Sequence, residues 1–251
     1  MKTSFVIRGL ITPWTANCIA SIRYYYPNSE IIFSTWDYVE IPNHIICDKI
    51  VKSQDPGNTH NNQSLTNRQI VTAQAGLQQV KTEQVVCLRS DMVFYSDNLL
   101  KQNYFRRTSK KASHYLWEHY IVTSSYYTVN PFGPLKLPYH VADRYQFGKT
   151  NDVKEYWNVN LTNDNMPKLR IEQHLLCENI KKTPDKMVYG ELQHDMDVNE
   201  NNAKDTLHWI QNNFIIADDH KIGINCEKYQ WVPPTFPCLI TADVFEIIKA
   251  F

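Results

Sequence analysis

A positive and a negative side chain stand together at the end of a short apolar run. Arg89, Ser90 and Asp91 directly follow the segment 84–88, whose sequence is QVVCL. A guanidinium is suited to binding phosphate, and a carboxylate is suited to binding a divalent cation. A strand-end ion pair or an ordinary turn would use the same residue types without any ligand. The spacing therefore has two interpretations, a phosphate or metal site and a purely structural pair.

The apolar run itself predicts a buried β-strand, because it is short and lies between polar flanks. Ahead of it the pattern predicts strands over 4–7, 30–34 and 45–51 and helices over 17–25 and 67–80. Strands and helices in this order are typical of an α/β sheet with crossover helices. Ligands of such sheets bind at the carboxyl ends of the strands, where Arg89 and Asp91 emerge. Neither GxGxxG nor GxxxxGKS/T occurs in the chain, so neither a dinucleotide-binding fold nor a P-loop is supported.

Composition narrows the class of protein. The chain has 251 residues, of which 43% are hydrophobic and 21% charged, and its formal net charge is zero. These values suit a globular protein with a sizeable core and give no basic field for nucleic acid, so no nucleic-acid partner is expected. Six scattered cysteines without CxxC spacing argue against a zinc site and favour a reducing compartment. Because neither a signal-peptide pattern nor a membrane-spanning run is present, we expect a cytoplasmic protein.

The second half of the chain differs in character from the first. Its pattern predicts strands within 114–125 and over 214–216, and helices over 151–157, 169–180, 206–213 and 241–251. A basic cluster, which either contacts anionic lipid at the inner face of a membrane or is a solvated surface, comprises Arg106, Arg107, Lys110 and Lys111. Since no repeat or linker interrupts the chain, we expect one domain over 1–251, with a nucleotide-binding half at 1–91 and an acceptor-side half at 92–251.

Several segments, taken in order, resemble the WavE-type lipopolysaccharide-synthesis proteins, which belong with the GT-A-fold glycosyltransferases. The matching pieces are SQDPG at 53–57, NRQI at 67–70, AGL at 75–77, LRSD at 88–91, FGKT at 147–150 between Asp143 and Asp152, and Glu172-Gln173. The resemblance implies a GT-A-like α/β domain with a Rossmann-like half and a mixed central sheet. It also implies transfer of a sugar from a nucleotide-activated donor to a glycan or lipid-linked acceptor, in bacterial-type lipopolysaccharide or capsular polysaccharide synthesis.

The chain departs from the wider GT-A pattern at one carboxylate. Such enzymes commonly carry Asp-x-Asp at the end of this strand, but here Arg89 stands in the first position and only Asp91 remains. Asp91 still suits Mg²⁺ or Mn²⁺ if donor phosphates complete the coordination shell. Alternatively, Arg89 neutralises the pyrophosphate directly and the metal is dispensable. A literal Asp-x-Asp occurs later, at 195–197, in a polar stretch that no predicted strand precedes.

The resemblance also suggests which residues bind the donor. Arg89 and Arg68 are the candidates for direct phosphate contact, and Arg68 lies near a helix start, whose dipole favours anions. Arg8, Asp37 and Asp55 each follow one of the first three predicted strands, where GT-A loops contact base and ribose. Ordinary alternatives exist for them, since Asp55 opens an Asp-Pro-Gly turn and Arg68 suits a solvated helix end.

Transfer also needs a group that takes the proton of the acceptor hydroxyl, and the candidates are Asp143 and Glu172. Asp143 lies in a segment that also carries His140, Arg144 and Tyr145, which are suited to orient it. We expect Asp143 to bind the acceptor or the donor sugar, and Glu172 to be the base if the reaction inverts the anomeric centre. The reverse assignment is open, and Glu172 also suits a simple first-turn acid of a helix.

Two other functions fit the same residues. The first is a nucleotide-dependent transferase of a sugar phosphate or polyol phosphate, which would use the same phosphate-binding groups. The second is a carbohydrate-binding or scaffold protein on a degenerate transferase fold. Loss of the carboxylate before Asp91 favours the scaffold, whereas the presence of Asp143 and Glu172 together favours an enzyme.

Overall fold

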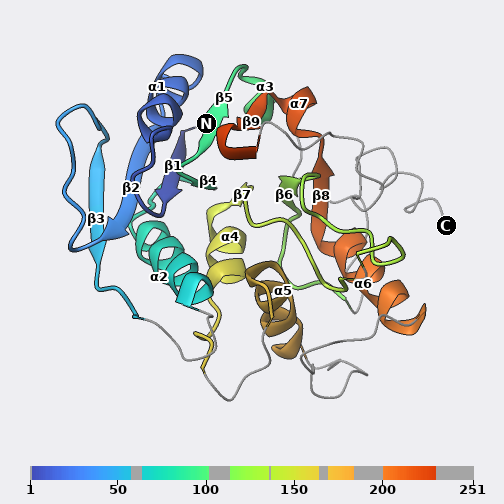
Figure 1. Cartoon of the computed structure of the whole chain (residues 1–251). Helices are drawn as coiled ribbons and strands as arrows, with labels where there is room; N and C mark the ends of the chain where they lie inside the picture. Colours follow the sequence, from blue (N-terminus) through green and yellow to red (C-terminus); the bar gives the residue numbers. More distant parts are fainter. Residues whose placement is uncertain are drawn as a thin grey trace.

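A seven-stranded sheet forms the centre of the computed structural model, which describes residues 2–57, 64–101, 114–135, 137–163, 169–183 and 200–229 (Figure 1). The strands of this sheet are β1 (Thr3–Arg8), β2 (Glu30–Trp36), β3 (Lys49–Ser53), β4 (Gln84–Arg89), β6 (Ile121–Ser124), β7 (Tyr145–Lys149) and β8 (Phe214–Ala217). Their order across the sheet is β3-β2-β1-β4-β7-β6-β8.

Strand direction divides the sheet at β7. Strands β3, β2, β1 and β4 are mutually parallel, β7 runs antiparallel to both β4 and β6, and β6 is parallel to β8. The 3-2-1-4 order is that of a nucleotide-binding α/β half. The mixed central sheet confirms the predicted α/β, GT-A-like fold class. Because β4 and β7 are hydrogen-bonded neighbours, the two expected halves of the chain share one sheet.

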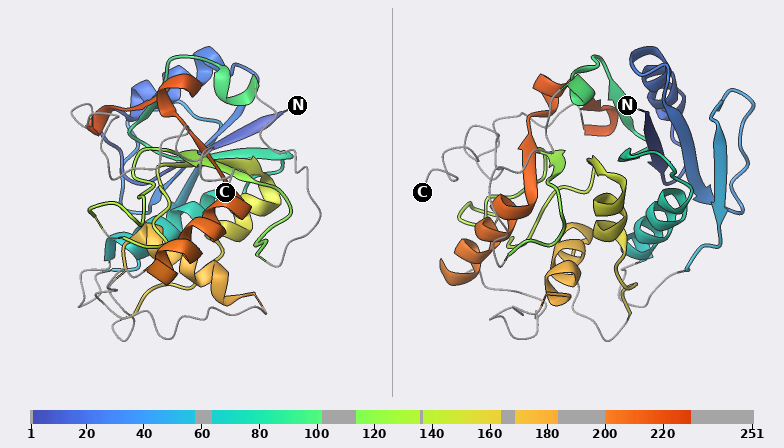
Figure 2. Two further views of the ribbon diagram at one scale, coloured as in Figure 1. Left: turned by 90° about the vertical axis from the view of Figure 1, so that its right-hand side faces the viewer. Right: turned by 180° about the vertical axis from the view of Figure 1, so that it is seen from behind.

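Helices cover both faces of this sheet (Figure 2). They are α1 (Thr15–Tyr25), α2 (Ser64–Gln78), α3 (Asn98–Lys101), α4 (Thr150–Trp157), α5 (Ile171–Lys181), α6 (Glu200–Asn213) and α7 (Asp219–Ile222). Helices α2, α4, α5 and α6 contribute to one hydrophobic core, and α1, α3 and α7 to the other. The strands supply both cores by alternation, since Val6 of β1 faces the first while Phe5 and Ile7 face the second. Burial of apolar side chains on each face holds the layers together.

Helix α2 illustrates how the local sequence sets the packing. Its residues Ile70, Ala73 and Leu77 recur at helical spacing, and all three are buried. At Gly76 an added Cβ would lie 2.5 Å from a methyl carbon of Val6, so the absence of a side chain allows the helix to cross β1 closely. This close approach fixes the first turn of α2 beside the carboxyl ends of the strands.

A two-stranded ribbon lies beside the main sheet and was not predicted. It pairs β5 (Met92–Phe94) antiparallel with β9 (Ile224–Cys226), and the short 3-10 helix η1 (Glu227–Tyr229) follows. Three-residue strands are too short to show a period of two. The ribbon returns the chain to the end of β4, where the Glu227 amide donates to the Asp91 carbonyl over 3.1 Å. Of the part of the chain that the structure describes, no helix is long and apolar enough to cross a membrane.

Candidate functional site

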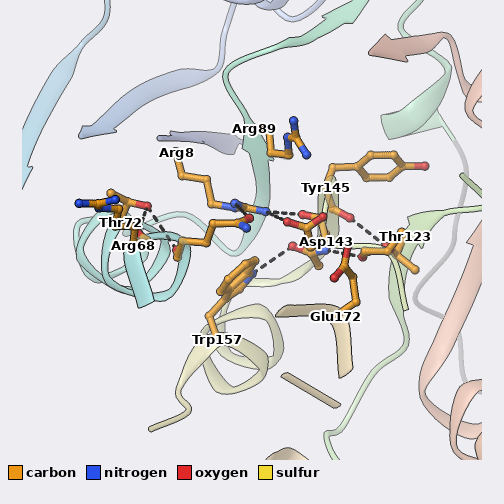
Figure 3. Close-up of polar contacts among 12 residues, drawn as sticks. Arg8, Arg68, Thr72, Arg89, Thr123, Asp143, Tyr145, Trp157 and Glu172 are labelled. Carbon is orange, nitrogen blue, oxygen red and sulfur yellow. Dashed lines mark hydrogen bonds and ion pairs between the residues drawn. The ribbon is translucent and has the colours of Figure 1, made fainter. Parts of the chain in front are cut away.

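Most of the predicted functional residues meet at one edge of the sheet (Figure 3). Arg8 ends β1 and Arg89 ends β4, so both lie at the carboxyl ends of parallel strands. Strand β7 is antiparallel, so its beginning lies at the same edge, and Asp143 precedes it by two residues. Helix α5 adds Glu172 from its first turn. This is the edge at which ligands of open α/β sheets bind.

Arg8 and Asp143 form a buried ion pair. Nη2 of Arg8 lies 3.1 Å from Oδ2 of Asp143 and also donates to the Asp143 carbonyl, while Nη1 donates to Gln69 Oε1 over 2.7 Å. The guanidinium stacks 4.5 Å from the centre of the Trp157 ring. Only 2% of Arg8 is exposed, so it holds β1, α2, α4 and the start of β7 together. This placement differs from the expected contact of Arg8 with a nucleotide-sugar, which stays a prediction.

The surroundings keep Asp143 ionised. Burial opposes its charge, but the guanidinium groups of Arg8 and Arg89 outweigh burial and hold the pKa of Asp143 below its ordinary value. With 3% of its surface exposed, Asp143 is inaccessible to a bulky acceptor. An ionised, enclosed carboxylate is suited to positioning its neighbours and poorly suited to accepting a proton at neutral pH.

Glu172 differs from Asp143 in its exposure and in the direction of its pKa shift. Its side chain is 15% exposed, and burial together with the negative charge of Asp143 raises its pKa to about 7. Helix α5 fixes its position, since the Arg170 amide donates to Gln173 Oε1 over 3.4 Å and Gln173 Nε2 donates to the Pro138 carbonyl over 3.0 Å. A carboxylate whose pKa lies near neutrality is matched to general acid or base work.

Arg89 and Asp91 form a two-point ion pair at the end of β4. Arg89 Nε lies 3.1 Å from Asp91 Oδ1, and Arg89 Nη2 lies 2.6 Å from Oδ2. Asp91 is 4% exposed at its side chain and Arg89 is 23% exposed, so the guanidinium is the more accessible partner. Geometry of this kind matches the planar fork of arginine to a carboxylate.

The donor set around Asp91 does not fit a divalent cation as it stands. Both oxygens of Asp91 accept from Arg89, and no group of three or more His, Cys, Asp or Glu side chains forms a metal cluster among the residues described above. A cation at Asp91 would first require Arg89 to release the carboxylate. The predicted Mg²⁺ or Mn²⁺ at Asp91 therefore stays a prediction, and the pair favours the alternative in which Arg89 meets the phosphates.

A second group of predicted residues gathers around an exposed tyrosine. Asp55 accepts two bonds from Arg68 Nε, at 2.9 and 3.1 Å, and a third from the Tyr38 hydroxyl at 3.3 Å. The exposed carboxylate of Asp37 accepts from the Tyr38 amide over 2.8 Å. Trp36 is 2% exposed and belongs to the core, so it offers no surface for stacking on a base, whereas Tyr38 is 60% exposed. Figure 3 shows Arg68 set apart from Asp143 and Glu172.

A further charged group at this edge joins Arg144 to Asp219, of which only Asp219 was not predicted from the sequence. Arg144 lies over the rings of Tyr126 and Tyr127, at 4.9 and 4.6 Å, and 4.0 Å from Asp219. Asp219 accepts from the Ser124 hydroxyl over 2.7 Å, and burial raises the pKa of Asp219 to about 7. Asp219 follows the end of β8, so the rule that indicated Arg89 at a strand end also applies here.

Some predictions fall outside the described residues. These are the basic cluster of Arg106, Arg107, Lys110 and Lys111, the Asp-x-Asp at 195–197 and the helix over 241–251.

A family model described as WavE lipopolysaccharide synthesis matches residues 4–232, which include both groups of predicted site residues. A search of curated proteins found no match.

Proposed function

The chain belongs to the WavE lipopolysaccharide synthesis family, and from this premise we propose that it is a glycosyltransferase that uses a nucleotide-activated sugar. The acceptor is a glycan or a lipid-linked glycan of lipopolysaccharide or capsular polysaccharide synthesis. One observation carries the proposal. A partly exposed guanidinium, Arg89, and a carboxylate with a pKa of about 7, Glu172, interact electrostatically at the ligand-binding edge of the sheet. Glycosyl transfer needs a cation for the leaving diphosphate and a base for the acceptor hydroxyl.

The donor diphosphate is placed against Arg89 in this proposal. As the bond between C1 of the sugar and the phosphate oxygen breaks, its electron pair stays on the phosphate, whose negative charge the guanidinium stabilises. The ion pair with Asp91 holds the guanidinium in one orientation, which lowers the cost of organising it for each turnover. The proposed step needs no divalent cation at Asp91.

The nucleoside is placed against the group around Tyr38. The exposed ring of Tyr38 offers a stacking surface, and the carboxylates of Asp37 and Asp55 are acceptors for ribose hydroxyls or base N–H groups. Arg68 lies in the first turns of α2 and is bonded to Asp55, so it adds positive charge to this end of the site. The placement of the nucleoside is thus supported by the exposure of Tyr38 and by the hydrogen-bonding capacity of Asp37 and Asp55.

The acceptor hydroxyl is placed against Glu172 in this proposal. As the acceptor oxygen attacks C1, its proton passes to the Glu172 carboxylate, and direct displacement of this kind inverts the anomeric centre. Asp143 stays ionised beside Arg8 and Arg89 and positions them. The near-neutral pKa of Glu172 favours an enzyme over a non-catalytic scaffold, because nothing in carbohydrate binding requires a carboxylate tuned in this way.

A release assay tests the proposed reaction. The full chain is incubated with UDP-, GDP-, CMP- and dTDP-linked sugars and with an extracted lipopolysaccharide acceptor, and the freed nucleotide is measured. We expect release from one donor class that depends on the acceptor and is lost in Glu172→Gln. Release of a nucleoside monophosphate from a nucleoside diphosphate sugar would indicate transfer of a sugar phosphate. No release from any donor, with the fold intact, would favour the scaffold alternative.

A further inference from the structure

His140 is held in one tautomer by its surroundings. Its side chain is 1% exposed, and Nδ1 lies 2.8 Å from the backbone carbonyl of Tyr127. A carbonyl oxygen only accepts, so Nδ1 carries the hydrogen, and in the neutral ring Nε2 then presents a lone pair. Within the described chain Nε2 has no hydrogen-bond partner, and it lies 3.7 Å from Oε2 of Glu172.

This arrangement is most favourable when a proton lies between the two groups, which is the state that follows proton transfer from the acceptor. A lone pair on Nε2 repels an ionised Glu172, whereas a protonated Glu172 would donate to it once the 3.7 Å separation shortens to hydrogen-bond length. Burial lowers the pKa of His140 to about 4 and raises the pKa of Glu172 to about 7, so Glu172 is the member that holds the proton near neutral pH. The raised value is therefore supported by geometry as well as by burial.

Backbone strain surrounds the same contact. In the described residues two non-glycine residues have positive φ, Tyr127 at 68° and Tyr139 at 58°. Tyr127 supplies the carbonyl that fixes Nδ1, and Tyr139 directly precedes His140. Such conformations are unfavourable for residues with a side chain, and they persist where the surrounding structure enforces them, often at functional sites. Of the two, Tyr127 contacts the imidazole through its carbonyl, and Tyr139 is the backbone neighbour of His140.

We propose that His140 is a positioning residue for Glu172, with which it forms a proton-sharing pair that receives the proton of the acceptor hydroxyl. The inference rests on the proposed transferase function. The acceptor O–H bond breaks as the oxygen bonds to C1, the proton bonds to a Glu172 oxygen, and Oε2 then donates it toward His140 Nε2. The leaving phosphate takes the electron pair of the broken C1–O bond, so no further reactant is needed.

Other charges face the pair and enter its titration. Glu172 interacts electrostatically with Asp143, Arg170 and Arg89. His140 interacts electrostatically with Arg170 and Asp143. Asp143 favours a proton on the pair, while the arginines oppose it. A readout at His140 itself is therefore sharper than a pH profile of the rate.

Nitrogen NMR of the full chain tests the pair without any substrate. Long-range proton–nitrogen spectra report the state of each imidazole nitrogen, and comparison with His140→Asn identifies the His140 signals among the nine histidines. In a titration from about pH 5.5 to about pH 8.5, we expect an unprotonated Nε2 whose nitrogen chemical shift changes with a midpoint near pH 7. In Glu172→Gln the same chemical shift should not depend on pH. An Nε2-protonated tautomer, or an unchanged titration in Glu172→Gln, would overturn the pair.

Two substitutions at His140 separate positioning from folding. His140→Asn keeps an N–H for the Tyr127 carbonyl and lacks Nε2. His140→Gln places an amide near Glu172, and an amide accepts a hydrogen bond but does not take up a proton as an imidazole nitrogen does. With the donor that the release assay identifies, we expect His140→Asn to lower kcat at least about tenfold with donor KM nearly unchanged. Unchanged kcat in His140→Asn would overturn the role. If the wild-type protein is inactive but its NMR spectra still show the pair, the transferase function is rejected and the pair itself is not.

Discussion

Arg89 and Asp91 are joined by two hydrogen bonds, Nε to Oδ1 at 3.1 Å and Nη2 to Oδ2 at 2.6 Å, at the point where GT-A enzymes commonly use a carboxylate for a metal. The positive charge that a cation would supply is thus already present in the protein. The carboxylate orients the guanidinium and the guanidinium faces the more open side. In the proposed mechanism, Arg89 therefore binds the phosphates from the position that the first carboxylate of Asp-x-Asp would occupy.

Removing the carboxylate of the Arg89–Asp91 pair should lower the stability of the protein. In Asp91→Asn, the buried amide presents one acceptor in place of two charged oxygens, so we expect a loss of about 1–3 kcal/mol in the free energy of unfolding. Urea unfolding of the variant and the wild type measures this loss. The exposed acid Asp37 provides the control, and Asp37→Asn should change stability by less than about 0.5 kcal/mol. Equal stability of Asp91→Asn and wild type would show that the pair is not formed.

The Arg8–Asp143 pair should be structural. Arg8→Ala removes a cation that is 2% exposed and leaves Asp143 buried without its nearest partner, so we expect a loss of about 3–5 kcal/mol. A double-mutant cycle with Asp143→Asn should show strong coupling between the two positions. Additive effects of the two substitutions would contradict the pair and would return Arg8 to the list of direct donor contacts.

The rate should depend on the ionisation of Glu172. A base must be deprotonated to act, so kcat should rise with pH through about 7 and level off above it. Glu172→Gln should lower kcat by about 10²–10⁴ and remove this rise. The matched control is Glu178→Gln in the same helix, which should leave the profile unchanged. A wild-type profile that is flat across neutrality would remove Glu172 from the base role.

Stability should fall with rising pH through Asp219. The pKa of this buried carboxyl is raised from 3.8 to about 7, so the folded state binds more protons than the unfolded state between these values. Its favourable contribution is present at the acid end and is lost as pH rises through about 7. Asp219→Asn, which mimics the protonated form toward the Ser124 hydroxyl, should therefore flatten the pH dependence of unfolding. An unchanged slope in this variant would contradict the raised value.

Local patterns explain what the sequence predicted about the fold. The apolar run before Arg89 forms β4, and the helical spacing of Ile70, Ala73 and Leu77 forms α2, because both signals arise within one element. Strand β7 was missed because its buried Gln146 breaks the apolar pattern. That side chain is satisfied by the Trp157 indole and the Ala142 carbonyl, both at 3.0 Å.

The candidate site shows the same limit at longer range. Arg89 and Asp91 were recognisable because a strand end and two charged residue types lie within three positions. The relation of His140 to Glu172 was not recognisable, because it depends on the Tyr127 carbonyl and on where α5 begins. Contacts between distant segments are fixed by packing, and a single sequence carries no local signal for them.

The most direct test of the central claim is a thermal-shift measurement of nucleotide binding. Wild type, Arg89→Ala and Arg89→Lys are each melted with UDP, GDP, CMP or dTDP, in Mg²⁺, in Mn²⁺ and in EDTA. A ligand at a hundredfold excess over Kd stabilises the folded state by about 2.7 kcal/mol. We predict that one nucleotide raises the wild-type Tm even in EDTA and that Arg89→Ala abolishes the shift. A shift that appears only with metal would return the phosphate site to Asp91, and the absence of any shift would contradict the nucleotide-dependent function itself.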